Sequence, residues 1–391
     1  MISSIEIKNF KSIKSKIFPL RNLNVLLGLN GQGKSSFIQS LLLLRQSNME
    51  RDRSKGWLIL KGKYIDIGNT KDVFYQYAKK EDLIFNLSIN DDITIPFCYV
   101  YETEKDVLSP KLVKDVIETK IDFESLILKS KRETGLFSSQ FQYLNAYRIQ
   151  PSSTYPKSNN EVVQNRNIGV NGQYAAHFIE TYHDEEVAFD NMLHPNSFVE
   201  DTILKKTIVD KTLVNQINLW LGEISPGINV RTTTINHDEV LLEYVYNQPT
   251  YGNTNKFKPI NVGFGITYAL PVVTALLSAK SGALLIIENP ESHIHPRGQA
   301  ELGKLIALVA ENDVQIIIET HSDHILNGIR VGIKEGKLSK DKAKLFYFKK
   351  VVEEQEQYSS VTDILLDKNG TLSEYPENLL DEWTNQLAKL I

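Results

Sequence analysis

Hydrophobic and polar positions follow two different periods in the first fifty residues. Residues 5–10 alternate apolar and polar side chains, which predicts a half-buried strand, and residues 23–27 form a short apolar run typical of strands covered on both faces. Residues 35–46 then place apolar side chains at helical spacing, with no proline to interrupt them. A strand followed directly by a helix indicates the start of an α/β unit.

The middle of the chain has mainly the period of strands. Between residues 57 and 151, short β-rich pieces are separated by Lys, Glu, Asp and Asn, and this pattern predicts a largely antiparallel layer. Residues 151–171, rich in Ser, Asn and Pro, predict a loop. Residues 205–221 have helical spacing, and residues 229–246 predict a hairpin that turns at 236–239. The β-rich pieces are YIDIG, LIFNLSI, ITIPFCYVYE and FQYLNAYRI.

Strands and helices alternate again from residue 260 onward. Apolar runs at 283–287 and 314–318 predict buried strands, and a helical pattern follows the second run through residue 333. A polar loop, 247–258, precedes this region, and the sequence indicates no role for it. The predicted domains are an α/β core of residues 1–50 and 256–344, an insertion of residues 51–255 and a small C-terminal domain of residues 345–391. The insertion divides into a β-rich layer, about 51–150, and a helical and hairpin part, about 151–255.

Composition narrows the class of protein. With 391 residues, 41% of them hydrophobic, the chain can bury a large core. The longest apolar runs are far shorter than the roughly 18 residues of a membrane helix, and the polar start lacks an apolar signal core. The single cysteine, Cys98, excludes an internal disulfide framework and a multi-cysteine zinc site. We therefore expect a cytoplasmic protein that does not enter a membrane.

The charge pattern gives little support for general nucleic-acid binding. A formal net charge of -4 argues against a chain that coats nucleic acid without sequence preference. The best candidate for a local basic patch is KNFKSIKSK at residues 8–16. The solvated face of a strand pair explains that run more simply, because such charges usually face water.

One motif carries specific chemistry. Residues 28–35, GLNGQGKS, fit the pattern G-x-x-x-x-G-K-S between the predicted strand and helix, the context that separates a phosphate loop from an incidental glycine-rich turn. The glycines let successive amide N–H groups face the phosphates, the lysine neutralises β- and γ-oxygens, and the serine hydroxyl ligates Mg²⁺. We expect ATP and Mg²⁺ as cofactors. The predicted nucleotide contacts are Asn30, Gly31, Gln32, Gly33, Lys34, Ser35 and Ser36.

A carboxylate ends the predicted strand at 283–287. Glu288 is the candidate acid on the Mg²⁺ side, where it would act together with Ser35. An alternative takes Glu291, His293 and His295 as ligands of a transition metal, but no further histidine or cysteine accompanies them in sequence. The first interpretation is therefore preferred.

The residues after these two strands raise the question of which group activates water. Asn289 can orient a water molecule but cannot accept its proton. Glu291 is the preferred base and Glu319 the other candidate, although Glu291 could equally be a structural acid. His321 follows the next strand and is either a γ-phosphate sensor or a structural histidine. Ligands gather at the carboxyl edge of parallel strands, so these residues and the phosphate loop are expected to form one site.

With these residues in place, the chain resembles the ABC/SMC-type branch of P-loop ATPases, in particular the OLD-like AAA ATPases common in prokaryotic defence operons. The resemblance covers nearly the full length of the chain. It is to a subgroup of these ATPases that has the sequence ENPE at the Walker B strand and a small C-terminal domain. It implies that Gly263 and Gly265, in the signature segment, contact the ATP of a partner subunit. The segments that carry it are IEIKNFKSI, GLNGQGKSS, NVGFGITYALPVV, ENPESHIHP and IIETHSDHILNGIR.

The resemblance implies a fold and a function. The expected fold is an α/β P-loop NTPase with an ABC/SMC-like ATPase head, an antiparallel β-rich accessory layer and a helical insertion. The expected function is a slowly hydrolysing ATP switch that forms a homodimer or higher homo-oligomer and controls a separate effector, a nuclease or toxin, in defence against phage or foreign DNA. The alternatives are a non-hydrolysing ATP-dependent scaffold and a DNA-end binding or repair ATPase, for which DNA would be the partner.

Two departures from the family limit the expectation. The sequence has no heptad run long enough for coiled-coil arms, so it cannot tether distant DNA as chromosome-organising relatives do. It also lacks a second acidic αβ domain after the head, the nuclease of the fused OLD-type proteins. Any cutting of nucleic acid would therefore need a partner.

Overall fold

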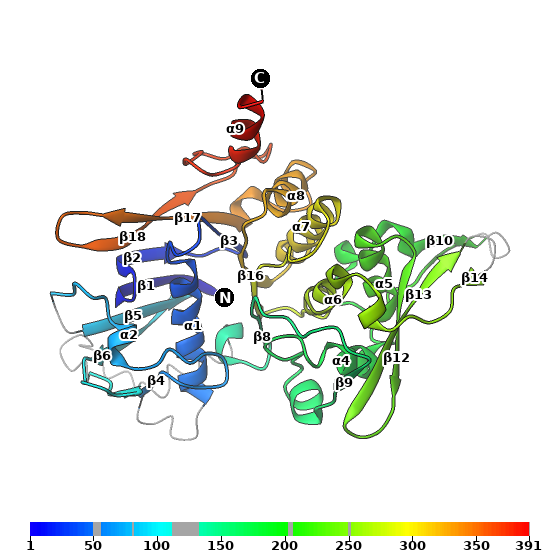
Figure 1. Cartoon of the computed structure of the whole chain (residues 1–391), viewed down its shortest axis with the longest axis horizontal. Coiled ribbons are helices and arrows are strands. Elements are labelled where there is room, and N and C mark those ends of the chain that lie inside the picture. Colours follow the sequence, from blue (N-terminus) through cyan, green and yellow to red (C-terminus); the bar gives the residue numbers. More distant parts are fainter. Residues whose placement is uncertain (50–55, 80–81, 112–132, 202–205, 249–251, 391) are drawn as a thin grey trace. The chain divides into compact units, whose positions relative to one another are not determined.

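A computed structural model of the chain describes residues 1–49, 56–79, 82–111, 133–201, 206–248 and 252–390. The chain forms two compact units, which are described one at a time. The first contains residues 1–138, 343–365 and 372–391, and the second contains residues 139–342 and 366–371. Figure 1 labels the helices and strands of both.

The first unit contains the predicted antiparallel layer. Four strands pair in the order β2-β1-β5-β6, each antiparallel to its neighbour. Along β5 the side chains alternate between half-buried and buried, as expected for a sheet with one face on the core. The prediction of an antiparallel layer is confirmed for β5 and β6, whereas β1 and β2, which pair in the same sheet, come from residues that were assigned to the ATPase core. Their bounds are β1 Ile2–Phe10, β2 Ile13–Pro19, β5 Asp82–Ile89 and β6 Ile93–Val100.

A second group of strands in this unit positions the phosphate loop. Strand β3 (Leu23–Leu27) pairs in parallel with β17 (Ala343–Val352), which pairs antiparallel with β18 (Gln357–Ile364). The helix predicted at 35–46 is α1 (Lys34–Met49), which begins directly after the loop. Four rings, those of Phe18, Phe37, Phe346 and Phe348, contact one another between these elements. The shorter elements of this unit are β4 Leu58–Ile59, α2 Thr70–Val73, β7 Val107–Leu108, the 3-10 turn Gly135–Phe137 and α9 Glu382–Ala388.

The second unit contains a parallel sheet that corrects one prediction. Strand β15 (Ala283–Glu288) pairs in parallel with β16 (Val314–Glu319) on one side and with β8 (Phe141–Leu144) on the other. The piece FQYLNAYRI was predicted in the antiparallel layer, and this assignment is wrong for β8. All four β8 residues are buried, so the strand shows no alternation that would have revealed its partners. The helices that flank the strands in sequence are α6 Phe264–Leu277, α7 Pro296–Glu311 and α8 Asp323–Lys334.

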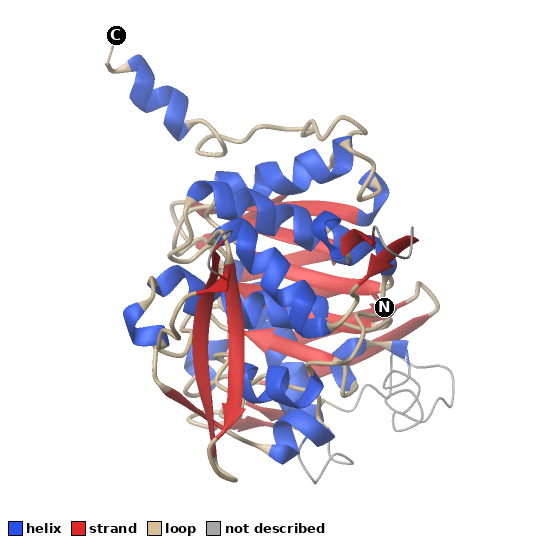
Figure 2. Cartoon of the chain, turned by 90° about the vertical axis from the view of Figure 1, so that its right-hand side faces the viewer, coloured by secondary structure: helices blue, strands red, loops and turns tan. Residues whose placement is uncertain are grey.

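The rest of the second unit is built around a long hairpin. The predicted hairpin is confirmed as β12 (Ile228–Thr234) and β13 (Glu239–Gln248), the long strand pair that faces the viewer in Figure 2. Helices α4 (Ala175–Tyr182) and α5 (Leu213–Ile224) pack on it. The helix predicted at 205–221 begins only at Leu213, because residues 206–209 form strand β11 instead. Ile208 lies five residues before Leu213, outside the four-residue helical spacing that Leu213, Ile217 and Leu221 follow.

Shorter elements complete the second unit. The predicted loop at 151–171 contains strand β9 (Thr154–Pro156), which pairs with β13, and a helical turn at 160–164. Among the residues that the structure describes, no helix is long and apolar enough to cross a membrane. The remaining pieces are β10 Phe198–Asp201, β11 Lys206–Val209, β14 Gly252–Asn253 and the 3-10 turns Asp190–Met192, Pro195–Ser197, Pro259–Asn261 and Lys340–Lys342.

Candidate functional site

The predicted phosphate loop has the backbone that its glycines allow. Gly28, Gly31 and Gly33 have φ angles of 129°, 73° and 105°, in the left-handed region that non-glycine residues rarely adopt. Lys34 is 2% exposed, and its Nζ donates hydrogen bonds to the carbonyl oxygens of Gly28, at 2.8 Å, and Leu29, at 3.0 Å. The loop thus curls over its own lysine. Its remaining predicted members lie between β3 and the first turn of α1 and are Asn30, Gln32, Ser35 and Ser36.

In the second unit, β8 and the segment that follows it bind the end of β15. Glu288 accepts hydrogen bonds from the Tyr143 hydroxyl, at 2.8 Å, and from the Ala146 N–H, at 3.3 Å. The Arg148 guanidinium donates to the Glu288 carbonyl oxygen at 2.8 Å. These three residues were not among the predicted site residues, because β8 had been assigned to the other sheet. Glu288 is therefore held at both its side chain and its backbone.

Burial shifts the pKa values of two side chains at this strand end. It raises the pKa of the Glu288 carboxyl and lowers the pKa of Arg148 to about 10. The Arg148 side chain is 4% exposed, and its Nε and Nη1 have no hydrogen-bond partner among the described residues. At neutral pH the guanidinium keeps its positive charge, which favours the ionised form of the neighbouring carboxylate.

The residues after β15 and β16 lie together, as the sequence predicted. Glu288 is paired in register with Glu319, and the Asn289 N–H donates to the Glu319 carbonyl oxygen at 2.8 Å. Glu291 accepts from the Thr320 hydroxyl, at 2.8 Å, and from the His321 N–H, at 2.9 Å. Burial raises the pKa of the Glu291 carboxyl. Through its two carboxylate oxygens, Glu291 thus connects the loop after β15 to the residues after β16.

Asn289 follows Glu288 directly and has an unusual backbone conformation. Its φ of 44° lies in the left-handed region, which asparagine and aspartate adopt more readily than most residues. Its side-chain Oδ1 is buried and has no hydrogen-bond partner among the described residues. A buried oxygen of this kind normally binds ordered water or a ligand.

The predicted signature segment begins helix α6. Gly263 is the N-cap, is exposed and would have no atom within 4 Å of an added Cβ. An added Cβ at Gly265 would lie 2.4 Å from the His293 carbonyl oxygen, so Gly265 lets α6 approach the loop after β15. The Phe264 side chain is 54% exposed.

The histidines of the alternative metal site have separate partners. The His293 ring packs against Tyr268, with 4.7 Å between ring centroids, whereas His295 caps α7 by accepting from the Arg297 N–H. Glu291 is bound to the loop after β16. Within the described part of the chain, no group of three or more His, Cys, Asp or Glu side chains is arranged to hold a metal ion.

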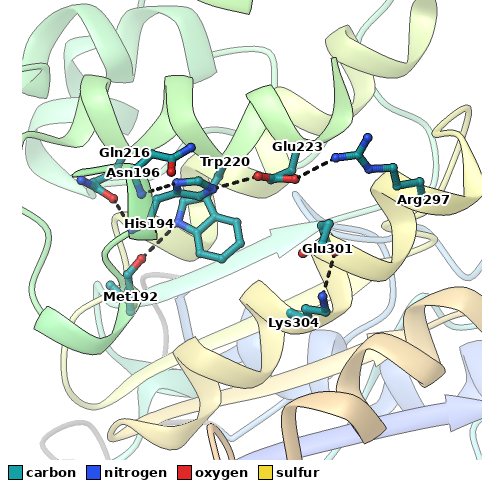
Figure 3. Close-up of polar contacts among 9 residues, drawn as sticks. All are labelled: Met192, His194, Asn196, Gln216, Trp220, Glu223, Arg297, Glu301 and Lys304. Atoms are coloured by element: carbon teal, nitrogen blue, oxygen red, sulfur yellow. Dashed lines mark hydrogen bonds and ion pairs between the residues drawn. The ribbon is translucent and has the colours of Figure 1, made fainter. Parts of the chain in front are cut away.

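A further polar cluster lies between α5 and α7 (Figure 3). His194 Nδ1 accepts from the Asn196 N–H at 3.1 Å, so Nε2 carries the hydrogen and donates to Glu223 at 3.2 Å. Glu223 also lies 3.5 Å from the exposed Arg297 guanidinium. Since the histidine nitrogens are both used, this cluster serves to pack the helices together.

Comparison with known families agrees with this geometry. Residues 23–327 match a family model described as "AAA domain, putative AbiEii toxin, Type IV TA system". The chain belongs to this family. Residues 338–390 match a second family model, described as "Protein of unknown function (DUF3696)". No curated protein was found to match the chain.

Solved structures confirm the fold. A crystal structure of an SmcHead bound to the C-winged helix domain of ScpA is 13% identical, with a TM-score of 0.54, and covers 94% of this chain and 98% of its own. The Smc head domain of Pyrococcus furiosus, with an extended coiled coil and bound to the C-terminal domain of ScpA, is 10% identical, with a TM-score of 0.51, over 100% and 99% of the two chains. The predicted ABC/SMC-type P-loop ATPase fold is confirmed, whereas the OLD-like subgroup stays a prediction.

The buried Arg148 gives a prediction about stability. We expect Arg148→Met to lower the free energy of unfolding by about 1–3 kcal/mol, because it leaves the buried Glu288 carbonyl oxygen without its donor. Arg297→Met is the matched control, since its ion pair is exposed and should contribute less than about 1 kcal/mol. Urea unfolding followed by circular dichroism measures both. Equal midpoints for the two variants would show that Arg148 does not hold this strand end.

Proposed function

We propose that the protein is an ATP-binding and slowly hydrolysing switch subunit, which dimerises around nucleotide and controls a separate effector. The observation that carries the proposal is the phosphate loop, which curves through three left-handed glycines into the N-terminus of a 16-residue helix. The positive end of a helix dipole with an adjacent lysine favours a polyphosphate, and the family supports ATP as the nucleotide.

The residues present fit a nucleotide with its metal ion. Lys34 would exchange its hydrogen bonds to the loop carbonyls for β- and γ-phosphate oxygens. Mg²⁺ would neutralise charge that develops on the phosphates. Its proposed protein ligands are the Ser35 hydroxyl and, directly or through water, the Glu288 carboxylate, both oxygen donors of the kind that Mg²⁺ prefers. The domain division into residues 1–50 with 256–344 as the ATPase core is part of this proposal.

Slow turnover follows from the groups beside Glu288. Asn289 can orient a water molecule through its partnerless Oδ1, but an amide cannot take a proton from it. Glu291 has hydrogen bonds to both carboxylate oxygens, which supports a structural role for it more than a role as base. Loss of a general base typically costs about 10²- to 10⁴-fold in rate. We therefore propose hydrolysis that is measurable but well below the usual range of enzymes.

Assembly around nucleotide is supported by the exposed start of α6. Gly263 has open space around its Cα, so this helix N-terminus could receive the γ-phosphate of ATP bound to a second copy. His321 would lie in the same proposed site as a contact to that phosphate. The partner is then a second copy of this chain, related by two-fold symmetry.

The biological setting is proposed from the family description. The words "putative AbiEii toxin, Type IV TA system" support a toxin–antitoxin or defence setting, in which the effector is a separate nuclease or toxin. A cytoplasmic location fits this setting. The basic run predicted as a DNA contact has neighbouring acids: Lys14 pairs with Glu356, and Lys16 with Asp363. These ion pairs favour the interpretation of a solvated strand face.

Nucleotide binding can be tested at the loop lysine. Lys34→Ala should weaken ATP binding by about 100-fold or more, since each charge-assisted hydrogen bond contributes about 1.5–3 kcal/mol. Isothermal titration calorimetry measures the affinity, and circular dichroism checks the fold. Lys337→Ala, which removes an exposed lysine of the second unit, is the control. Unchanged affinity in a folded Lys34→Ala protein would refute the phosphate-loop assignment.

The amide at position 289 gives a test of slow hydrolysis. Aspartate, like asparagine, adopts the left-handed backbone conformation of position 289 readily. Because Asn289→Asp supplies a carboxylate that can accept a proton, we expect kcat to rise by about tenfold or more. Glu291→Gln serves as the comparison and should change kcat less than Asn289→Asp does. Phosphate release at saturating ATP is the measurement. A wild-type rate of tens per second, with no gain in Asn289→Asp, would contradict a slow switch.

Assembly can be tested at the exposed N-cap of α6. Gly263→Arg fits the isolated chain, because an added side chain meets open space, but it should block a facing subunit. We expect ATP to increase the mass of the wild type from one chain to two and to leave the variant unchanged. Light scattering with and without ATP measures this, and Gly222→Arg on α5 is the control. ATP-dependent dimerisation of Gly263→Arg would exclude this surface from the interface.

A further inference from the structure

We propose that the β17–β18 hairpin, at the start of the segment that matches a family of unknown function, is part of the nucleotide site. It holds the phosphate loop in place and forms one wall of a cavity for the nucleoside of ATP. The inference rests on the proposed ATP binding, and it assigns a ligand to a part of the chain outside the match to the AAA family.

Hydrogen bonds connect the hairpin to the phosphate loop. The Ser359 hydroxyl donates to the Gln32 carbonyl oxygen at 2.7 Å and lies 2.8 Å from the Ser12 hydroxyl. The Ser359 N–H donates to the Ser12 carbonyl oxygen at 2.7 Å. On the other strand, the Lys350 N–H donates to the Gln32 side-chain oxygen. Both strands of the hairpin therefore fix the tip of the loop.

Steric contacts show how close this approach is. A Cβ added to Gly28 would lie 2.3 Å from the Phe348 carbonyl oxygen, and one added to Gly33 would lie 2.2 Å from the Ser359 hydroxyl. Separations below 3 Å force some atom to move, and the Phe348 carbonyl belongs to the backbone of β17. The two outer glycines of the motif are thus required by the hairpin as well as by their positive φ angles.

A cavity of about 180 Å³ opens beside the same loop. Its walls come from Gly31 of the loop, from the segment containing Tyr75 and Tyr77, and from Tyr358 and Ser359 of the hairpin. The Tyr75 and Tyr77 rings lie 5.7 Å apart, and the Tyr75 hydroxyl donates to Glu356 at 3.1 Å. Three aromatic side chains and the phosphate loop therefore share one cavity.

The chemistry of this cavity fits a nucleoside. When the β- and γ-phosphates lie at the start of α1, the α-phosphate and the sugar must leave the loop along a neighbouring surface. Ser12 also lines the cavity, and its hydroxyl lies 3.3 Å from the Ser36 hydroxyl of α1. The cavity therefore begins where the proposed phosphate site ends. Aromatic rings stack on bases of any sequence, which suits the adenine of ATP.

Two ligands separate the two parts of the proposal. Inorganic tripolyphosphate needs only the phosphate loop, whereas ATP needs the loop and the nucleoside cavity. Ser359→Ala should weaken the binding of both by about 5- to 30-fold, because it removes the hydroxyl that holds the loop. Ser360→Ala is the matched control, since Ser360 is exposed on the other face of the same strand. Calorimetry of each variant gives the four affinities.

Tyr358 tests the cavity wall independently of the loop. Tyr358→Ala should weaken ATP by about 5- to 100-fold and leave tripolyphosphate unchanged, because stacking on a base is lost. Tyr358→Phe keeps the ring and should bind ATP as the wild type does. Tyr375→Ala, which removes an exposed ring of the C-terminal segment, is the control. Melting temperatures verify that each variant is folded.

The outcomes distinguish this inference from the proposed function. If the wild type binds ATP, Lys34→Ala does not, and the Ser359 and Tyr358 variants match their controls, the hairpin has no part in the nucleotide site and the ATPase proposal stands. If the wild type binds neither ATP nor tripolyphosphate, the proposed function fails first. Should Ser359→Ala not fold, unchanged ATP binding by Tyr358→Ala would still overturn the nucleoside cavity.

Discussion

The phosphate loop curves through three left-handed glycines, and because glycine has the greatest backbone freedom, contacts with neighbouring segments must hold the loop in place. Helix α1 fixes one end of it, and β17 approaches the other end so closely that only glycine fits at position 28. The tip rests on Ser359 of the hairpin. These contacts connect the C-terminal segment to a motif near the N-terminus.

The second unit meets a different constraint, the partial burial of two carboxylates. A buried carboxylate is costly unless donors reach its oxygens. At Glu288 the donors come from Tyr143 and Ala146, and at Glu291 they come from the loop after β16. Arg148 adds a positive charge at the same strand end. The acids are thus fixed in orientation before any ligand arrives, which suits a site that positions a metal ion and a water molecule.

The periodic parts of the sequence predicted the fold well where one pattern had one interpretation. The apolar runs before Gly28, Glu288 and Glu319 are the strands β3, β15 and β16, and the helix after the phosphate loop is α1. The prediction was wrong for residues 141–144, because a short strand buried on both faces shows no alternation. That error concealed Tyr143 and Arg148. It was also wrong for residues 206–209, because Ile208 lies five residues before Leu213 and so does not continue the helical spacing of Leu213, Ile217 and Leu221.

The sequence by itself determined the phosphate loop and the acid and amide at the end of β15, and its resemblance to known ATPases implied the ABC/SMC-type head. The loop and the strand end depend on residue types at fixed local spacing, and such spacing is set by the geometry of one strand, one turn or one helix. Only the tertiary structure decided which distant side chains complete these local motifs: Arg148 and Tyr143 at Glu288, and Ser359 at the phosphate loop. These partners come from segments more than 100 residues away, and their meeting depends on strand pairing, which no local pattern encodes.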